Sequence, residues 1–215
     1  MSIESRRARE KQARIDSIKE SAWKIFLRDG FQNAKIAEIA KECSLGLATL
    51  YYYFKDKRQI VYSLMLEYKR ENHAEHVALI DKGVTVREFI RGYIDSYLNH
   101  LDHFRFFVLA DSFYNYHHQY DLTDPVIREY DSETRENGDY ILKVLSAGLE
   151  ADEVDRVRVI VAMILGFLRR YVLLPAKSWP KNDAQRDKMT VDFLELVYGM
   201  FEAAGVSLEL PLKRP

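Results

Sequence analysis

A run of hydroxyl-bearing and basic side chains lies near the N-terminus, where Thr49 and Tyr51-Tyr52-Tyr53 are followed by Lys55 and Lys57. A threonine offers a hydroxyl to either base type and a methyl group to thymine, whereas tyrosine hydroxyls and ammonium groups suit phosphate oxygens. Three consecutive helical residues point in different directions, so at least one tyrosine ring must be exposed. An exposed ring beside two lysines favours contact with DNA, and packing in an aromatic core is the alternative.

These side chains need a short helix that is anchored on one face and open on the other. Apolar spacing predicts helices at about 35–43 and 47–54, joined by the turn Ser44-Leu45-Gly46 and preceded by a helix at about 9–28 that stops at Gly30. Leu50 and Phe54 share one helix face and are expected to point inward. Asn33 is expected to cap the second helix. The pattern predicts a helix-turn-helix.

Three segments closely resemble the DNA-binding signature of the tetracycline-repressor (TetR) family. They are Gly30-Phe31-Gln32-Asn33, Ile36-Ala37-Glu38-Ile39-Ala40 and Leu50-Tyr51-Tyr52-Tyr53-Phe54-Lys55-Asp56-Lys57, and the resemblance covers about residues 14–60. It implies an all-α fold in which an N-terminal three-helix helix-turn-helix domain is followed by a C-terminal helical ligand-binding and dimerisation bundle. The expected domains are residues 1–57, with a basic N-terminal arm, and residues 58–215.

The resemblance also assigns contacts with double-stranded DNA. Those contacts fall on Lys35, Ile36, Leu47, Ala48, Thr49, Tyr51, Tyr52, Tyr53 and Lys57. The chain departs from the family where Ala34 and Lys35 replace two frequent threonines, so Lys35 gains a potential phosphate contact, and where Ser44 replaces a frequent glycine. The outward residues offer few hydrogen bonds to bases, so readout is expected to depend on van der Waals contact and DNA shape.

Charge is divided unevenly along the chain. Residues 1–57 hold 12 Lys and Arg against 8 Asp and Glu, a balance of +4 that leaves −5 for the rest of a chain whose net charge is −1. A basic segment on an acidic body suggests nucleic-acid binding at one end. Arg6, Arg7, Arg9 and Lys11 are expected to precede the first helix as an arm that touches phosphates or the minor groove, with a solvated tail as the alternative.

Aromatic residues and histidines crowd residues 89–120, a stretch that includes His117, His118 and Tyr120. Helical spacing is expected to place Tyr93, Tyr97 and His100 on one face, and Phe107, Asp111 and Tyr114 on the next helix. Flat apolar walls with a few polar groups suit a small-molecule effector that is hydrophobic or aromatic and has one polar handle. Ordinary core packing is the alternative for any single ring.

Metal and redox chemistry have weaker support. The pairs His73/His76 and His100/His103 have a spacing that could share a metal, but no cysteine cluster or matching acid accompanies them. Surface histidines are therefore expected, with no metal site and no cofactor. Cys43 is the sole cysteine, which precludes an intrachain disulfide, and it is expected to be a small buried thiol.

The segment Val159–Leu168 is apolar on all sides, so its helix is expected to be buried all round. It is too short to span a membrane. Ala162 and Gly166 permit close helix approach. With four apolar residues of the last helix, Phe193, Val197, Met200 and Phe201, the segment resembles the family's homodimer interface, a four-helix bundle. A monomeric core is the alternative.

Further helices are expected at about 58–78, 84–101, 104–117, 125–149, 153–174 and 185–204, with Asp124 capping the helix that starts at Pro125. No phosphate-binding glycine loop or nucleophile elbow is present, so an enzyme is not expected. The resemblance favours a repressor that an effector releases from a near-palindromic operator in the cytoplasm. A DNA-binding or architectural protein without an effector is the alternative.

Overall fold

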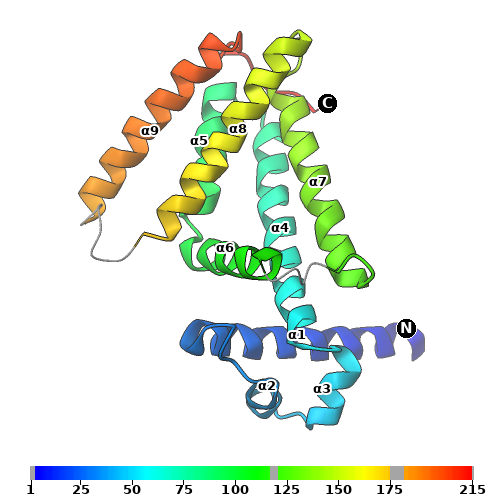
Figure 1. Cartoon of the computed structure of the whole chain (residues 1–215). Helices are drawn as coiled ribbons and strands as arrows, with labels where there is room; N and C mark the ends of the chain where they lie inside the picture. Colours follow the sequence, from blue (N-terminus) through cyan, green and yellow to red (C-terminus); the bar gives the residue numbers. More distant parts are fainter. Residues whose placement is uncertain (1–2, 117–120, 175–181, 215) are drawn as a thin grey trace. The chain divides into compact units, whose positions relative to one another are not determined.

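The computed structural model describes residues 3–116, 121–174 and 182–214, and within these ranges the chain is helical apart from loops and one isolated bridge between Thr85 and Pro211. The helices are α1 (Ile3–Asp29), α2 (Ile36–Glu42), α3 (Leu47–Tyr53), α4 (Lys57–Asp81), α5 (Val86–Leu98), α6 (Leu101–Tyr116), α7 (Pro125–Leu145), α8 (Ala151–Val172) and α9 (Asp183–Ala203) (Figure 1). The all-α prediction is confirmed. His117, His118 and Tyr120 lie outside the described residues.

The first helix is longer than expected. α1 begins at Ile3, so the prediction that Arg6, Arg7, Arg9 and Lys11 precede it is wrong. The segment that was expected to be an arm contains no glycine or proline to stop a helix, and the Arg6 and Glu10 side chains form an i,i+4 ion pair of 2.8 Å within it. The helix ends where expected, because Gly30 has a φ of +76°.

The chain forms two compact units. The N-terminal unit comprises Met1–Lys69 and Leu109–Ser132, and the C-terminal unit comprises Arg70–Val108 and Glu133–Pro215. Helices α4, α6 and α7 therefore each contribute residues to both units. None of the described helices is both long enough and apolar enough to cross a membrane.

In the N-terminal unit, α2 and α3 lie on the same side of α1 (Figure 1). The α1 residues Ala22 and Phe26 are buried, as are Leu50 in the middle of α3 and Phe54 directly after it. Rings from four other parts of the unit complete this core. The Tyr114 ring centroid lies 6.0 Å from that of Phe31 and 5.5 Å from that of Tyr62, and the Tyr62 and Tyr130 centroids lie 5.3 Å apart.

In the C-terminal unit, α5 starts at a capping box in which Thr85 and Glu88 satisfy each other's backbone N–H groups. The chain end pairs with this start, because Val86 N donates to Leu210 O at 3.0 Å and Leu212 N donates to Val84 O at 2.9 Å. Helices α8 and α9 pack on each other through Phe167 and Phe193, whose ring centroids lie 3.8 Å apart. The unit thus has its own apolar core of α5, α8 and α9 residues.

Candidate nucleic-acid interface and sensor core

The helix-turn-helix is closed by a tight turn between α2 and α3. Leu45 N donates to Ala40 O at 2.8 Å, and Ser44 adopts a φ of +55° in the left-handed region that favours glycine. Cys43 precedes the turn as a buried thiol whose pKa is raised by burial, in agreement with the prediction. The turn therefore fixes the direction in which α3 leaves α2.

Helix α3 is buried on one side and open on the other, as its sequence predicts. Leu50 and Phe54 point into the core. The open side consists of five residues with exposed side chains: Leu47, Ala48, Thr49, Tyr51 and Tyr52. Tyr51 is 49% and Tyr52 77% exposed, whereas Tyr53 is half-buried and meets the Tyr52 ring edge-on at 5.1 Å. A short helix that is anchored on one side and exposes apolar and hydroxyl groups on the other presents a surface suited to a DNA groove.

The start of α2 differs from the expectation. Lys35 is the N-cap and makes no side-chain capping bond, so the prediction that Asn33 caps this helix is wrong. Asn33 lies too early in the turn, and its Nδ2 donates to Asp29 O at 3.1 Å, at the end of α1. Lys35 is exposed and Ile36 is half-buried at the same end of α2.

The Lys57 ammonium group bonds backbone carbonyl oxygens of its own unit, which the sequence does not predict. Its Nζ donates to Gln32 O at 2.8 Å and to Ala34 O at 2.9 Å, and burial lowers its pKa. The ammonium group therefore ties the first residue of α4 to the turn between α1 and α2. Backbone carbonyls carry no sequence signal, so sequence reasoning assigned this lysine only to a phosphate.

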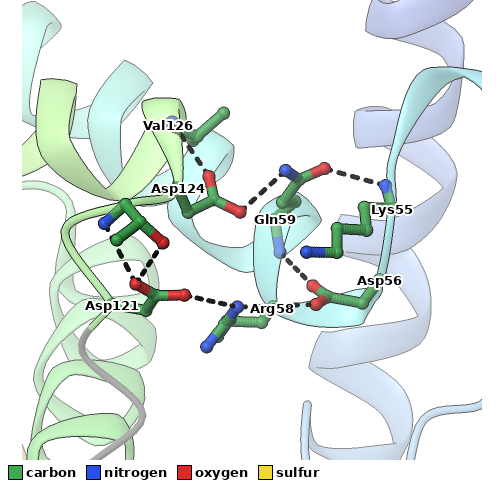
Figure 2. Close-up of polar contacts among 8 residues, drawn as sticks. Lys55, Asp56, Arg58, Gln59, Asp121, Asp124 and Val126 are labelled. Atoms are coloured by element: carbon green, nitrogen blue, oxygen red, sulfur yellow. Dashed lines mark hydrogen bonds and ion pairs between the residues drawn. The ribbon is translucent and has the colours of Figure 1, made fainter.

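A polar network holds the turn that follows α3 (Figure 2). Gln59 Oε1 accepts from Lys55 N, its own N donates to Asp56 Oδ1, and its Nε2 donates to Asp124 Oδ2, each at 2.8 Å. Asp124 Oδ1 accepts from Val126 N at 3.0 Å, which confirms the predicted cap of α7. Gln59 thus joins the end of the α3 segment to the start of α7 within one compact unit.

An ion-pair chain runs beside these bonds. Arg58 lies between two carboxylates, with its NH2 3.7 Å from Asp56 Oδ2 and 3.9 Å from Asp121 Oδ2. Asp121 is held in turn by Thr123, whose N and Oγ1 donate to Asp121 Oδ1 at 3.0 and 2.6 Å. The loop before α7 is therefore bonded to the start of α4 twice, once through Gln59 and once through Arg58.

The structure brings together only part of the predicted effector site. Tyr93, Tyr97 and Phe107 are buried in the C-terminal unit, where the Tyr97 ring lies 5.3 Å from Tyr93 and 4.8 Å from Phe104. His100 does not join them, because its side chain is half exposed and its Nε2 lies 3.5 Å from Glu75 Oε1.

The other two predicted residues belong to the N-terminal unit. Asp111 Oδ1 accepts from Tyr130 OH at 3.2 Å, and Tyr114 packs on Phe31 and Tyr62. Helix α6 contributes residues to both units, with the division between Val108 and Leu109. Phe107 therefore lies in one core, and Asp111 and Tyr114 lie in the other, although the three share one helix.

A buried polar cluster in the C-terminal unit was not foreseen. Asn72, His76 and Ser96 are 3%, 0% and 4% exposed. The Ser96 hydroxyl donates to Tyr93 O at 2.8 Å, so both Asn72 Nδ2 and His76 Nε2, each 3.0 Å away, must donate to it. His76 therefore carries a proton on Nε2. The prediction of a surface histidine is wrong for His76, because α4 turns it toward α5.

The amide oxygen of Asn72 is an unused acceptor in this cluster. Asn72 Oδ1 is buried and has no hydrogen-bond partner among the described residues. The nearby His76 ring centroid lies 4.6 Å from that of Tyr93. An unsatisfied buried carbonyl oxygen is costly, so this atom is a candidate acceptor for a hydrogen-bond donor.

Metal binding has no support in the described ranges, which contain no group of three or more His, Cys, Asp or Glu side chains placed to hold an ion. His73 Nδ1 lies 2.8 Å from Asn137 Oδ1, and His76 is engaged by Ser96. Of the two histidine pairs, His73 and His76 therefore have other partners, and His100 and His103 face each other edge-on with ring centroids 6.4 Å apart.

Helices α8 and α9 share an uncovered apolar face, which we call the α8–α9 face. Its exposed large side chains are Val159, Met163, Val191 and Leu196, and its exposed small residues are Ala162, Gly166 and Gly199. The expectation that 159–168 is buried all round is therefore wrong for a single chain. Val197 and Phe201, which were expected on this face, are buried in the core of their own unit.

The fold and the α2–α3 geometry define an all-helical protein with an N-terminal helix-turn-helix. Residues 18–64 match the family model described as bacterial regulatory proteins, tetR family. An HTH-type transcriptional regulator of Staphylococcus aureus (strain USA300) is 42% identical over 55 residues, which is 26% of this chain and 28% of that protein, and the relative from strain N315 matches equally. The N-terminal segment of this chain is therefore similar to the DNA-binding segment of the TetR family.

Solved structures extend the similarity to the fold of most of the chain. The ketosteroid transcriptional regulator KstR2 of Mycobacterium tuberculosis is 16% identical with a TM-score of 0.59, over 86% of this chain and 93% of that one. A transcriptional regulator of Rhodococcus sp. Rha1 has a TM-score of 0.63 at 16% identity, over 87% and 95%. A regulator of Pseudomonas aeruginosa PAO1 has a TM-score of 0.61 at 18% identity, over 89% and 94%. The curated relatives, in contrast, are matched over little more than a quarter of their length.

Proposed function

We propose that this protein is a ligand-responsive transcriptional regulator that acts in the cytoplasm as a repressor. It binds a near-palindromic operator as a homodimer and leaves it when a hydrophobic or aromatic effector binds. The observation that carries the proposal is the exposed side of α3, where Leu47, Thr49, Tyr51 and Tyr52 face solvent on a helix anchored by Leu50 and Phe54. Exposed apolar and hydroxyl groups on such a helix fit base edges and phosphates.

Residues 1–57 are assigned to DNA binding and residues 58–215 to effector binding and dimerisation. Direct contacts with DNA are proposed for the residues that the sequence predicts, except Lys57. Thr49 and the exposed Leu47 and Ala48 read bases, and Ile36 packs at the edge of the groove. The DNA backbone is contacted by Lys35, Tyr51, Tyr52 and Tyr53. Lys57 acts on this surface indirectly, since its ammonium group holds the turn at Gln32 and Ala34.

The α8–α9 face is proposed as the dimer contact. Leu196 is 68% and Val159 58% exposed, and the Cβ atoms that larger residues would add at Gly166 and Gly199 meet nothing within 4 Å. Exposed apolar side chains together with small residues on two adjacent helices suit a four-helix bundle formed with a second copy. Two-fold symmetry of the dimer then imposes a near-palindromic site on DNA.

The effector is proposed to bind at the buried aromatic and polar cluster of the C-terminal unit. Tyr93, Tyr97 and Phe107 supply flat apolar walls, and the Asn72 carbonyl oxygen supplies an acceptor. The polar handle of the effector would then be a hydrogen-bond donor such as a hydroxyl or an N–H group. His100, Asp111 and Tyr114 are not retained in this proposal because they face other surroundings.

The test is selection of duplexes from a random pool by the purified protein, followed by binding measurements on the selected site and a scrambled one. Thr49→Ala should change which sequence is selected and reduce the preference for the wild-type site by about 1–3 kcal/mol per half-site contact. No enrichment of any sequence would contradict the regulator and favour a non-specific architectural protein. Substrate turnover by the protein would favour an enzyme.

A further inference from the structure

An open groove of about 600 Å³ lies between the first half of α1 and the end of α3, wholly within the N-terminal unit. Its lining includes Arg7, Lys11 and Arg14 from α1 and Tyr52 and Tyr53 from α3. The three cations have i, i+4 and i+7 spacing, so they form a single stripe along one face of α1. At 1.5 Å per residue the stripe is about 10 Å long.

These three cations differ from most of the other basic residues of α1. Four others are paired with carboxylates: Arg6 with Glu10 at 2.8 Å, Lys19 with Glu67 at 2.9 Å, Lys24 with Glu20 at 2.8 Å and Arg28 with Asp29 at 2.6 Å. Arg7, Lys11 and Arg14 are exposed and have no carboxylate within ion-pair distance among the described residues. Carboxylates therefore neutralise these four cations of α1, whereas the three cations in the groove keep their positive charge.

The one acid in the groove does not cancel this charge. Glu10 lines it, but its Oε1 is 2.8 Å from Arg6 Nε, so that pair is neutral overall. The opposite wall is formed by Tyr52 and Tyr53, whose rings lie edge-to-face. Unpaired cations beside tyrosine hydroxyls suit a polyanion with a sugar backbone, because phosphate oxygens accept from both groups.

We propose that this groove binds the sugar–phosphate backbone of duplex DNA. The contacts come from the stripe of Arg7, Lys11 and Arg14 on α1, which we call the cationic rail and which lies beside α3. The inference rests on the proposed function and deepens it, because it adds a sequence-independent contact that the match at 18–64 does not contain. Arginine and lysine side chains are long, so the three cations of a stripe of about 10 Å can reach neighbouring phosphates of one strand. The rail lies on a helix, so its backbone is ordered before DNA arrives and only the side chains of the three cations lose entropy on binding.

The decisive measurement is the salt dependence of DNA binding. Each phosphate contact contributes about 0.9 to the slope of log affinity against log salt concentration. We expect Arg7→Gln/Lys11→Gln to lower the magnitude of the slope by about 2, and a triple variant with Arg14→Gln to lower it by about 3. The loss should be equal on the selected duplex and on a scrambled one, so the preference between them should stay unchanged.

A matched control removes the same charge from the same helix. Lys24→Gln/Arg28→Gln deletes two cations that are already paired with acids, and it should leave the slope unchanged. Arg7→Lys/Arg14→Lys keeps the charges and should retain the wild-type slope. Equal slopes for wild type and the triple variant would overturn the rail, as would an equal loss in the control, which would indicate a net-charge effect.

Failure of the α1 contact and failure of the proposed regulator function give different results. If wild type enriches a duplex but the groove variants keep its slope, the rail is wrong and the regulator stands. If wild type enriches no duplex, the regulator is wrong. If the groove variants instead lose affinity for single-stranded RNA that wild type binds more tightly than duplex DNA, the assignment of duplex DNA to the groove is overturned.

Discussion

Gln59 Nε2 donates to Asp124 Oδ2 at 2.8 Å, across 65 residues of chain. The two side chains serve both of the segments they join: Gln59 accepts from Lys55 N directly after α3, and Asp124 accepts from Val126 N as the cap of α7 (Figure 2). Asp124 is buried and has no ion-pair partner among the described residues, so its carboxyl group is satisfied by hydrogen bonds. Loss of either partner should therefore be felt at both segments.

Asp124→Ala should lower the free energy of unfolding by about 1–3 kcal/mol, because it removes a helix cap and leaves the Gln59 amide without its acceptor. Urea unfolding of wild type, Asp124→Ala, Gln59→Leu and the double variant measures the coupling between the two side chains. We expect the double variant to be less destabilised than the sum of the single variants by about 0.5–3 kcal/mol. Strict additivity would show that the bond contributes nothing to stability.

Ser44 offers a test of backbone strain in the helix-turn-helix. Its φ of +55° places a side-chain-bearing residue in the left-handed region. Ser44→Gly should relieve about 1–2 kcal/mol of strain and lose about 0.4–1 kcal/mol through the freer unfolded chain, a net gain of about 0.5–1 kcal/mol. Thermal unfolding should show the gain, and Ser44→Ala, which keeps the strain, should not. A Gly variant less stable than wild type would contradict this account.

Lys57→Met should destabilise the N-terminal unit rather than remove a DNA contact. The substitution keeps most of the side-chain length but loses two charge-assisted bonds to Gln32 O and Ala34 O, with an expected cost of about 1–3 kcal/mol. DNA affinity is expected to fall with the salt slope unchanged, since a phosphate contact would reduce that slope by about 0.9. A reduced slope with unchanged stability would instead place Lys57 on a phosphate.

The correct predictions rest on local sequence patterns, whereas the missed contacts join residues that are far apart in the sequence. The helix-turn-helix could be predicted because Leu50 and Phe54 are anchored by local periodicity, and the cap at Asp124-Pro125 is a local signal as well. Lys57 bonds backbone carbonyls, and His76 meets Ser96 from another helix, so neither contact leaves a pattern in the sequence.

The effector residues show a related limit. Helix α6 is continuous from Leu101 to Tyr116, and periodicity cannot reveal that it serves two cores. Phe107, Asp111 and Tyr114 were therefore expected at one site. The α8–α9 face was misjudged for another reason: an apolar helix must be covered, but the sequence does not say whether its own chain or a second copy covers it.

The titration of Tyr114 gives a pH-dependent test. Burial raises the pKa of Tyr114 to about 12, from an ordinary value of 10.0. The folded state thus resists ionisation that the unfolded chain undergoes, so this contribution to stability is complete below pH 10 and is lost as the pH rises toward 12. Tyr114→Phe keeps the packing ring and should show a smaller fall in unfolding free energy over that range. Identical pH profiles for the two proteins would contradict the assignment.

The final prediction tests the dimer through two glycines that look alike in the single chain. Gly166 on α8 and Gly138 on α7 are both exposed, and an added Cβ meets nothing within 4 Å at either. Leucine favours a helix over glycine by about 0.5–1 kcal/mol, so Gly166→Leu and Gly138→Leu should both leave the protomer folded and slightly more stable. Only Gly166 lies on the α8–α9 face, where a second copy would have to pack against the new side chain. Light scattering at micromolar concentration should therefore give a dimer for wild type and for Gly138→Leu, and a monomer or a weakened dimer for Gly166→Leu. Operator affinity should fall with the dimer, because each half-site then binds alone. A monomeric wild type, or three proteins of equal mass and equal dissociation constant, would remove the α8–α9 face from the proposed assembly.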